Sequence, residues 1–249
     1  MAKEKYGRYE LKYFLPFNRA EELIDQVKMH IKPDPHAIVT DGLPKYSIQS
    51  VYLDTEDLKL YYEKLDGLRD RKKFRIRTYC RPNEDTDVFF EIKYRYNTQV
   101  MKDRAKFSLK DVQDLLDNNI KLEEMDLPIT VRKPAERFCH YSNLMNFVPI
   151  VNVKYDRIPF IGKFDNQIRL TVDTNLSFID HRGSRKLFEP FVEEPVPLPG
   201  AILELKFDKF MPEWMRGITR NFEIRQQSIS KYAHCVDGAV FSKYEKIGA

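Results

Sequence analysis

Charged and apolar residues alternate along several segments of the sequence, and this alternation constrains the fold more than any other feature. In residues 72–80, Lys73, Arg75 and Arg77 take every second position, and apolar residues such as Phe74 lie between them. Successive side chains of a β-strand point to opposite faces of a sheet. This segment therefore predicts a strand with one charged face and one apolar face.

The same alternation recurs in further segments that predict strands. The charged positions on them are Arg8, Glu10 and Lys12 in residues 7–15; Glu91, Lys93 and Arg95 in residues 87–96; Lys102, Arg104 and Lys106 in residues 99–107; Arg169 and Asp173 in residues 166–174; and Glu204, Lys206 and Asp208 in residues 201–209. Together with the first segment, these charged faces carry twelve cations and five carboxylates. A solvated sheet face is normally polar with mixed charges, so this excess of cations needs another explanation.

Apolar residues at helical spacing predict helices between and after these strands. The predicted helices run from Asn18 as N-cap through Ile31, from Ser108 as N-cap through Leu116, over residues 130–146 and over residues 228–246, and further strands are predicted at residues 47–55 and 149–162. The apolar stripes of these helices need the apolar faces of the sheet, so the helices would cover its outside and the charged faces would turn inward. We therefore expect an α+β fold in one domain over residues 1–249: an antiparallel eight-stranded tunnel-like β-barrel with peripheral helices and a charged lumen.

The sequence lacks the signatures of several common enzyme and membrane classes. It has no GxGxxG or GxSxG motif, and its histidines show neither HxH nor HExxH spacing. Its first residues are polar, no apolar run is long enough to span a bilayer, and its three cysteines are widely spaced. We therefore expect a cytoplasmic protein without a transmembrane segment. The net charge of +4 is modest, and we expect no nucleic-acid partner.

An inward-facing excess of cations is costly unless an anion offsets it. Each uncompensated buried charge costs on the order of several kcal/mol even after the protein relaxes. The charged lumen therefore predicts a polyanionic ligand. The few carboxylates among the cations suit Mg²⁺ or Mn²⁺ bridging to phosphate oxygens, because these ions prefer oxygen ligands.

At the level of motifs, the sequence resembles a known family. The segments "YELKYFL", "SVYLDTEDLKLYYEKLDG", "RKKFRIRTY", "VFFEIKYR", "IRLTVD", "ILELKF" and "SISKY" occur in this order from residue 9 to residue 232. They are similar to the VTC domain, the polyphosphate polymerase branch of the triphosphate tunnel metalloenzymes. The resemblance implies an antiparallel tunnel that binds a nucleotide triphosphate or polyphosphate with Mn²⁺ or Mg²⁺. It implies a metal-binding carboxylate at Glu204 and phosphate-binding, catalytic positions at Lys12, Arg75, Arg77, Lys93, Arg169, Lys206 and Lys231.

Other charged positions extend this predicted site with weaker motifs. Lys102 and Arg104 would lengthen the basic track or lie in solvent, and Glu10 would help position metal or water or pair with Lys12. Ser230 would help bind an anion at the start of the last helix or cap it in the ordinary way. Lys93 has an alternative role as a cross-strand ion-pair partner of Glu91.

One position departs from the superfamily pattern. Other branches of the superfamily begin with ExExK, whereas the corresponding row here is Arg8, Glu10 and Lys12. One carboxylate fewer and one cation more favour holding a longer anionic chain, with Arg8 among the substrate-binding residues, over activating a water molecule.

The function that these inferences favour is ATP-dependent polyphosphate polymerisation. The alternatives are an inorganic or nucleoside triphosphatase that uses the same walls, and a noncatalytic module that binds polyphosphate or inositol phosphate. The sequence separates the three poorly, because affinity and catalysis use the same cations. It also leaves open recruitment by a membrane-bound partner.

Overall fold

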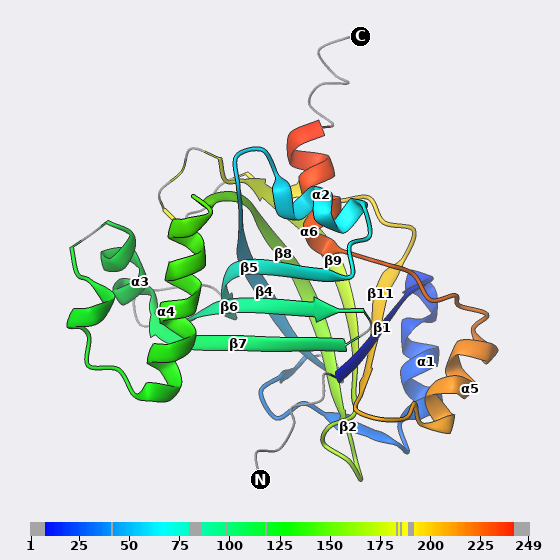
Figure 1. Ribbon diagram of the computed structural model, residues 1–249. Helices are drawn as coiled ribbons and strands as arrows, with labels where there is room; N and C mark the ends of the chain where they lie inside the picture. The colour runs from blue at the N-terminus through cyan, green and yellow to red at the C-terminus, as the bar shows by residue number, and fades with distance from the viewer. Residues whose placement is uncertain are drawn as a thin grey trace.

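The computed structural model of the chain describes residues 8–40, 42–79, 86–97, 99–117, 119–182, 184, 186–188 and 192–241. Its centre is a ring of eight antiparallel strands (Figure 1). The ring consists of β9 (Arg169–Asp180), β11 (Ala201–Phe207), β1 (Arg8–Leu15), β7 (Gln99–Ser108), β6 (Asp87–Tyr96), β5 (Asp70–Tyr79), β4 (Leu43–Asp54) and β8 (Val148–Gly162), which pairs back to β9. The predicted antiparallel tunnel with peripheral helices is therefore confirmed.

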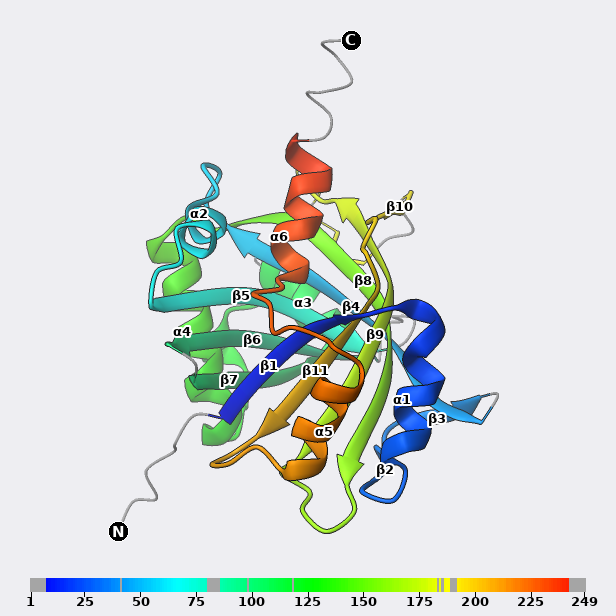
Figure 2. The same ribbon diagram turned by 90° about the vertical axis from the view of Figure 1, so that its right-hand side faces the viewer.

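Short strands and helices surround the ring. The short strands are β2 (Ile31–Pro33) beside β8, β3 (Ile38–Thr40) beside β4, and β10 (Glu194–Pro195) beside β9. The helices are α1 (Ala20–Val27), α2 (Lys59–Leu65), α3 (Leu109–Leu116), α4 (Ile129–Leu144), α5 (Glu213–Asn221) and α6 (Lys231–Val236). In both views, α1 and α5 lie outside β1, β11 and β9, α3 and α4 lie at the opposite side of the ring, and α6 and α2 lie at one end (Figures 1 and 2). No helix in the described part of the chain is both long and apolar enough to cross a bilayer.

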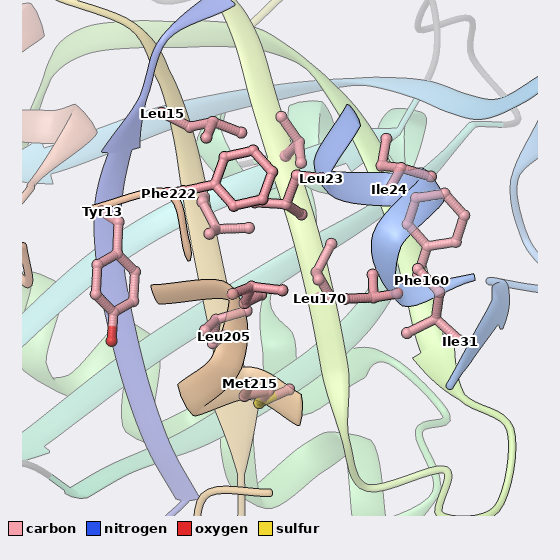
Figure 3. Packing of buried hydrophobic residues seen from close by; sticks show 14 of the residues in the cluster. Tyr13, Leu15, Leu23, Ile24, Ile31, Phe160, Leu170, Leu205, Met215 and Phe222 are labelled. Atoms are coloured by element: carbon pink, nitrogen blue, oxygen red, sulfur yellow. The ribbon is translucent and has the colours of Figure 1, made fainter. Parts of the chain in front are cut away.

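The first core fills the space between α1, α5 and the outer face of the ring. Leu170 and Leu205 are fully buried and point outward from β9 and β11, and they pack in one cluster with Leu23 of α1 and Met215 of α5 (Figure 3). Leu23, Ile24 and Val27 lie on one face of α1, so burial of this face holds the helix against the sheet.

A second core lies between α4 and the strands β5 and β6. Phe138 of α4 stacks on Phe90 with ring centroids 4.5 Å apart and meets Phe74 edge-on at 5.8 Å. Phe74 alternates along β5 with Lys73 and Arg75, so its burial against α4 turns both cations toward the inside of the ring. The helices therefore set which face of the sheet carries the charges.

Both predicted ends of the first helix were wrong. Asn18 is not an N-cap: Phe17–Arg19 forms a 3₁₀ turn after Pro16, and α1 begins at Ala20 with no side-chain cap. Ile31 does not end this helix, because it begins β2 and pairs with Gly162 of β8.

The other elements mostly follow the predicted spans. Ser108 caps α3 as predicted, accepting a hydrogen bond from the Asp111 amide at 3.1 Å. Helices α2 and α5 were not predicted, and the last helix continues past α6 as a π-helical turn over Asp237–Phe241. Gly7, Cys80 and residues 242–246, which the predictions placed in strands and in the last helix, lie outside the described residues.

We expect truncation of the first core to destabilise the protein. Leu170→Ala would remove a fully buried side chain and lower the free energy of unfolding by roughly 2–5 kcal/mol, because the tightly packed site cannot collapse around the cavity. Thermal unfolding measures the effect. Leu144→Ala, at a position 63% exposed on α4, is the matched control, and equal melting temperatures for the two variants would contradict this account of the core.

Candidate active site

The inner face of the ring borders a strongly basic cavity of about 220 Å³. Among the described residues that line it, eleven are lysine or arginine and two are glutamate. The cations are Lys12, Lys64, Arg71, Lys73, Arg75, Arg77, Lys93, Arg95, Arg157, Lys206 and Lys231, and the glutamates are Glu10 and Glu204. The predicted charged lumen is therefore confirmed.

A buried carboxylate, Glu91 of β6, holds the cations of one wall. Its side chain is fully buried, Arg75 reaches Oε2 at 2.6 and 2.8 Å, and Arg104 reaches Oε1 at 2.7 Å. Lys102 lies 3.2 Å from Oε1 and Arg77 lies 3.9 Å from Oε2. Burial alone would raise the pKa of Glu91, but these four cations outweigh it and hold the pKa well below its ordinary value. Glu91 stays ionised and fixes the position of the arginines.

Neutral hydroxyls complete the positioning of the two arginines on β5. Arg75 donates to the Tyr52 hydroxyl at 3.0 Å, and Arg77 donates to Ser50 at 3.0 Å and to the Tyr155 hydroxyl at 3.3 Å. These contacts hold each guanidinium without neutralising its charge. The positive charge of this wall therefore stays available to an anion.

A second carboxylate cluster lies where β1, β6 and β11 face one another. Lys93 contacts both oxygens of Glu10 at 2.7 and 2.9 Å, and Lys206 contacts Glu204 at 2.8 Å and Glu10 at 3.7 Å. Burial and the neighbouring Glu204 would raise the pKa of Glu10, but Lys93, Lys206 and Lys12 lower it to about 2. The ion-pair partner of Lys93 is thus Glu10 of β1, on the other side of β7, and not Glu91 on its own strand.

The sequence analysis missed Arg157, a central cation of the site. Arg157 of β8 makes a two-pronged contact with Asp173 of β9 at 2.7 and 2.8 Å and lies 3.6 Å from Glu204. Lys231 also contacts Asp173, at 2.5 Å. Arg157 escaped notice because the other residues on its face of β8, such as Val151, Val153 and Tyr155, carry no charge. Regular alternation therefore gave no signal there.

Lys73 and Ser230 meet at the start of α6. Lys73 donates to the Ser230 hydroxyl at 2.6 Å, and that hydroxyl also accepts from the Ala233 amide at 3.2 Å, so Ser230 is an ordinary N-cap as well as a lining residue. Burial, together with the charges of Lys12 and Lys93, holds the pKa of Lys73 well below its ordinary value.

The structure brings most of the predicted site residues together. Those that line the cavity are Lys12, Arg75, Arg77, Lys93, Lys206, Lys231, Glu10, Ser230 and Glu204. Four predicted residues, Arg8, Lys102, Arg104 and Arg169, are not part of this lining.

Those four residues lie at the edges of the site. Lys102 and Arg104 form ion pairs with Glu91 but do not line the cavity, and Arg8 pairs with Asp208 at 3.2 Å. Arg169 is in register with Lys206, but its side chain is 47% exposed and lies 3.8 Å from Asp34. Their predicted roles in phosphate binding stay predictions.

The site fits a divalent cation that shares its ligands with a bound phosphate. In the described part of the chain, no group of three or more histidine, cysteine, aspartate or glutamate side chains could form a protein-only metal site. Glu204 is nevertheless kept ionised, because the cations around it outweigh its burial and hold its pKa well below the ordinary value. Beside it in register, the buried Thr171 hydroxyl has no hydrogen-bond partner among the described residues. Mg²⁺ characteristically binds through one or two carboxylates plus phosphate and water oxygens, so Glu204 is the residue that could hold it.

The ring and its basic cavity define a tunnel protein with a strongly cationic interior. Comparison with known proteins gives the family: the model of the VTC domain matches residues 7–240, and the chain belongs to the VTC domain family. Subunit 4 of the vacuolar transporter chaperone complex from Schizosaccharomyces pombe is 22% identical over 98% of this chain, and subunit 4 from Trypanosoma cruzi is 24% identical over 75% of it. The chain spans only 38% and 27% of the lengths of these relatives.

Solved structures share the fold at low sequence identity. A proposed adenylate cyclase from Bacillus halodurans superposes with a TM-score of 0.52 at 13% identity, covering 90% of this chain and 94% of its own. A proposed adenylyl cyclase from Hippeastrum, described as having a dominant triphosphatase activity, also has a TM-score of 0.52, at 15% identity, covering 94% of this chain and 97% of its own. These likenesses establish the tunnel fold.

Replacing Glu91 is expected to destabilise the ligand-free protein. Glu91→Gln removes the charge that four cations share, and breaking a buried ion pair in this way costs roughly 3–5 kcal/mol. Added tripolyphosphate should restore part of the lost melting temperature, because it supplies a replacement anion. Glu213→Gln, which removes a 72% exposed carboxylate paired with Arg220, is the control; a Glu91→Gln protein as stable as this control would refute the positioning role.

The affinity for tripolyphosphate is expected to fall as pH rises through about 8. Burial and the nearby Lys12 and Lys206 lower the pKa of Lys93 to about 8, although Glu10 opposes them. A bound anion stabilises the charged form, so binding is strongest below this pKa and weakens by about tenfold between pH 7 and pH 9.

Lys93→Arg isolates this effect, because arginine keeps its charge over the whole range. Isothermal titration calorimetry with tripolyphosphate gives the affinity of both proteins at each pH. The difference between the two pH profiles removes the contributions of the ligand's own ionisation and of Lys102, whose pKa is also lowered to about 8 by burial. Parallel pH profiles for the two proteins would contradict the prediction.

Proposed function

We propose that this chain catalyses metal-dependent phosphoryl transfer from a nucleoside triphosphate to the end of a polyphosphate chain, as an ATP-dependent polyphosphate polymerase. The observation that carries the proposal is the lining of the cavity, with eleven cations against two glutamates. Such an excess is costly without an anion of high charge density. Membership of the VTC domain family supports an activity on triphosphate or polyphosphate.

Three arginines suit the binding of the transferring phosphoryl group. Arg75, Arg77 and Arg157 come from β5 and β8, and each is held by neighbouring side chains before a ligand arrives. Their planar forks match phosphate oxygens in pairs. Pre-positioned donors of this kind stabilise charge that develops in a phosphoryl-transfer transition state.

The proposed nucleophile is the terminal phosphate of the growing chain. One of its oxygens forms a bond to the γ-phosphorus of ATP while the bond from that phosphorus to the β,γ-bridging oxygen breaks, and ADP leaves. A phosphate end is already ionised at neutral pH, so the step needs no protein base. This agrees with the lining, in whose described residues no histidine occurs.

Glu204 would hold the divalent cation beside this wall. When bound, Mn²⁺ or Mg²⁺ supplies neutralisation of charge on the phosphate oxygens. Lys206, 2.8 Å from Glu204, orients the carboxylate, and the partnerless hydroxyl of Thr171 offers a further oxygen for a water molecule of the ion.

The chain is proposed to act within a larger assembly. Its relatives are named as subunits of a vacuolar transporter chaperone complex and are much longer than this chain. We infer protein partners, including a membrane-bound one that receives the product, for a catalytic unit that works at the cytoplasmic side.

The experiment that tests this function incubates the protein with ATP and Mn²⁺ and separates the products by chain length on a gel. Long phosphate chains are expected from the unaltered protein. Glu204→Ala and Arg75→Ala should each lower the initial rate by about 100-fold or more, because each removes a group that acts on the transferring phosphoryl group. Arg216→Ala, a 57% exposed residue on α5, is the control for the loss of one charge.

Two other results would overturn the polymerase assignment. Orthophosphate as the only product would make the chain a triphosphatase, with water in place of the phosphate nucleophile. A rise in melting temperature with ATP and no turnover would make it a binding module.

A further inference from the structure

The geometry points to a second phosphate-binding site at the end of the tunnel, formed by Lys64 of α2, Arg71 of β5 and Arg95 of β6. We name these three residues the mouth cluster. Its ligand would be the part of a polyphosphate chain that extends beyond the triphosphate held by Arg75 and Arg77, so the cluster would set how long a chain the protein retains. This inference rests on the proposed function and adds to it.

The pairing of β5 with β6 brings like charges together. Arg71 lies directly opposite Arg95, and the next inward-facing pair is Lys73 opposite Lys93. Directly opposed like charges destabilise an antiparallel pair. A carboxylate enters only at the third such pair, Arg75 opposite Glu91.

The cation-only pairs form a track that leads out of the site. Arg71 and Arg95 are next to the ends of their strands, since β5 begins at Asp70 and β6 ends at Tyr96. Arg75 lies four residue steps along β5 from Arg71, which is roughly 13 Å along the sheet. A long phosphate chain can contact both sites at once, whereas a triphosphate seated on Arg75 has few phosphates left for the mouth cluster.

No carboxylate neutralises the mouth cluster. Within the described segments, Lys64, Arg71 and Arg95 form no ion pair; Arg71 donates to the Lys64 carbonyl at 3.2 Å and Arg95 donates to the Asn97 carbonyl at 2.8 Å. Burial and the neighbouring arginines lower the pKa of Lys64, and burial and Arg95 lower the pKa of Arg71.

The nearest opposing charges only partly offset this repulsion. Asp237 acts on Lys64, but Asp237 already accepts a 2.5 Å hydrogen bond from the Tyr61 hydroxyl, and Glu63 acts on Arg71 from α2. Arg75, Arg77 and Arg157 differ from the mouth cluster, because Glu91 and Asp173 form ion pairs with them. The mouth cluster therefore carries positive charge that no ion pair within the described residues neutralises.

Neutral donors lie beside the mouth cluster. The segment that leads into α6 crosses β1 on its way to this end of the ring (Figure 2), and the Gln227 amide donates to the Lys12 carbonyl at 2.9 Å. Gln226, Gln227 and Ser228 line the same cavity as Lys64, Arg71 and Arg95. Side-chain amides and a hydroxyl beside half-buried cations suit a chain of phosphate groups, each of which accepts hydrogen bonds.

The test compares the binding of short and long phosphate chains. In Arg71→Gln/Arg95→Gln, the affinity for a long-chain polyphosphate should fall by about tenfold, since each lost cation–phosphate contact weakens binding by a few-fold. The affinity for tripolyphosphate should change by less than about twofold, because that ligand fills the inner site. Isothermal titration at one fixed salt concentration measures both.

The control is Lys72→Gln/Lys110→Gln, which removes the same number of charges outside the ring. Lys72 points outward from β5 toward Tyr141, and Lys110 lies exposed on α3. This variant should keep both affinities, and equal losses of long-chain affinity in the two double variants would show a non-specific charge effect and overturn the proposal. A mouth-cluster variant that weakens tripolyphosphate as much as the long chain would also overturn it.

Product length gives an independent readout. With ATP and Mn²⁺, the mouth-cluster variant should release chains several-fold shorter than those of the control variant, because the growing chain dissociates earlier. Products of equal length would contradict the proposal. If neither protein forms chains, the proposed polymerase function fails, while the titrations still decide whether the mouth cluster binds long polyphosphate.

Discussion

The inward orientation of the charged strand faces is the constraint on which the rest of this structure depends. Two sets of helices bury the apolar faces of the ring from outside, so lysine and arginine side chains share a small interior. On the strands, an inward charged side chain is oriented by a neighbouring apolar residue one position away, as Arg75 is by Phe74. The packing energy of the outer cores thus offsets the repulsion among the cations inside. A loss of outer packing would also free the charged side chains from their inward orientation.

Buried carboxylates offset part of the repulsion among these cations. Glu91 and Asp173 each hold arginines in fixed positions, while Glu10 pairs with Lys93 of β6 and Glu204 pairs with Lys206 on its own strand. The number of carboxylates in the lining is too small to neutralise the cations, and this shortfall is the basis of the proposed affinity for anions. A ligand therefore meets a site that is already ordered, and binding costs little reorganisation.

Alternation along the strands was enough to predict the ring, its inner charged face and nine of the thirteen charged residues in the lining, because each of these follows from the two-residue period of a strand. Arg157 could not be predicted in this way, since its face of β8 carries uncharged residues such as Val153 and Tyr155 at the preceding positions. The pairing of Lys93 with Glu10 was also beyond the sequence: β6 and β1 lie on either side of β7 in the sheet, and alternation along a strand does not give the order of the strands. The predicted start of the first helix was wrong for a local reason, because a 3₁₀ turn after Pro16 occupies the position of the expected cap.

The distribution of carboxylates divides the tunnel into two parts with different chemistry. Arginines deep in the ring are held by Glu91 and Asp173, which suits a step that needs fixed donors around a transferring group. Farther out, Arg71 and Arg95 have no such partner, and side chains that are less tightly held can follow a moving or variable ligand. A tunnel that must bind one phosphate group firmly and let the rest of a chain slide needs this contrast, and β5 and β6 provide it along a single pair of strands.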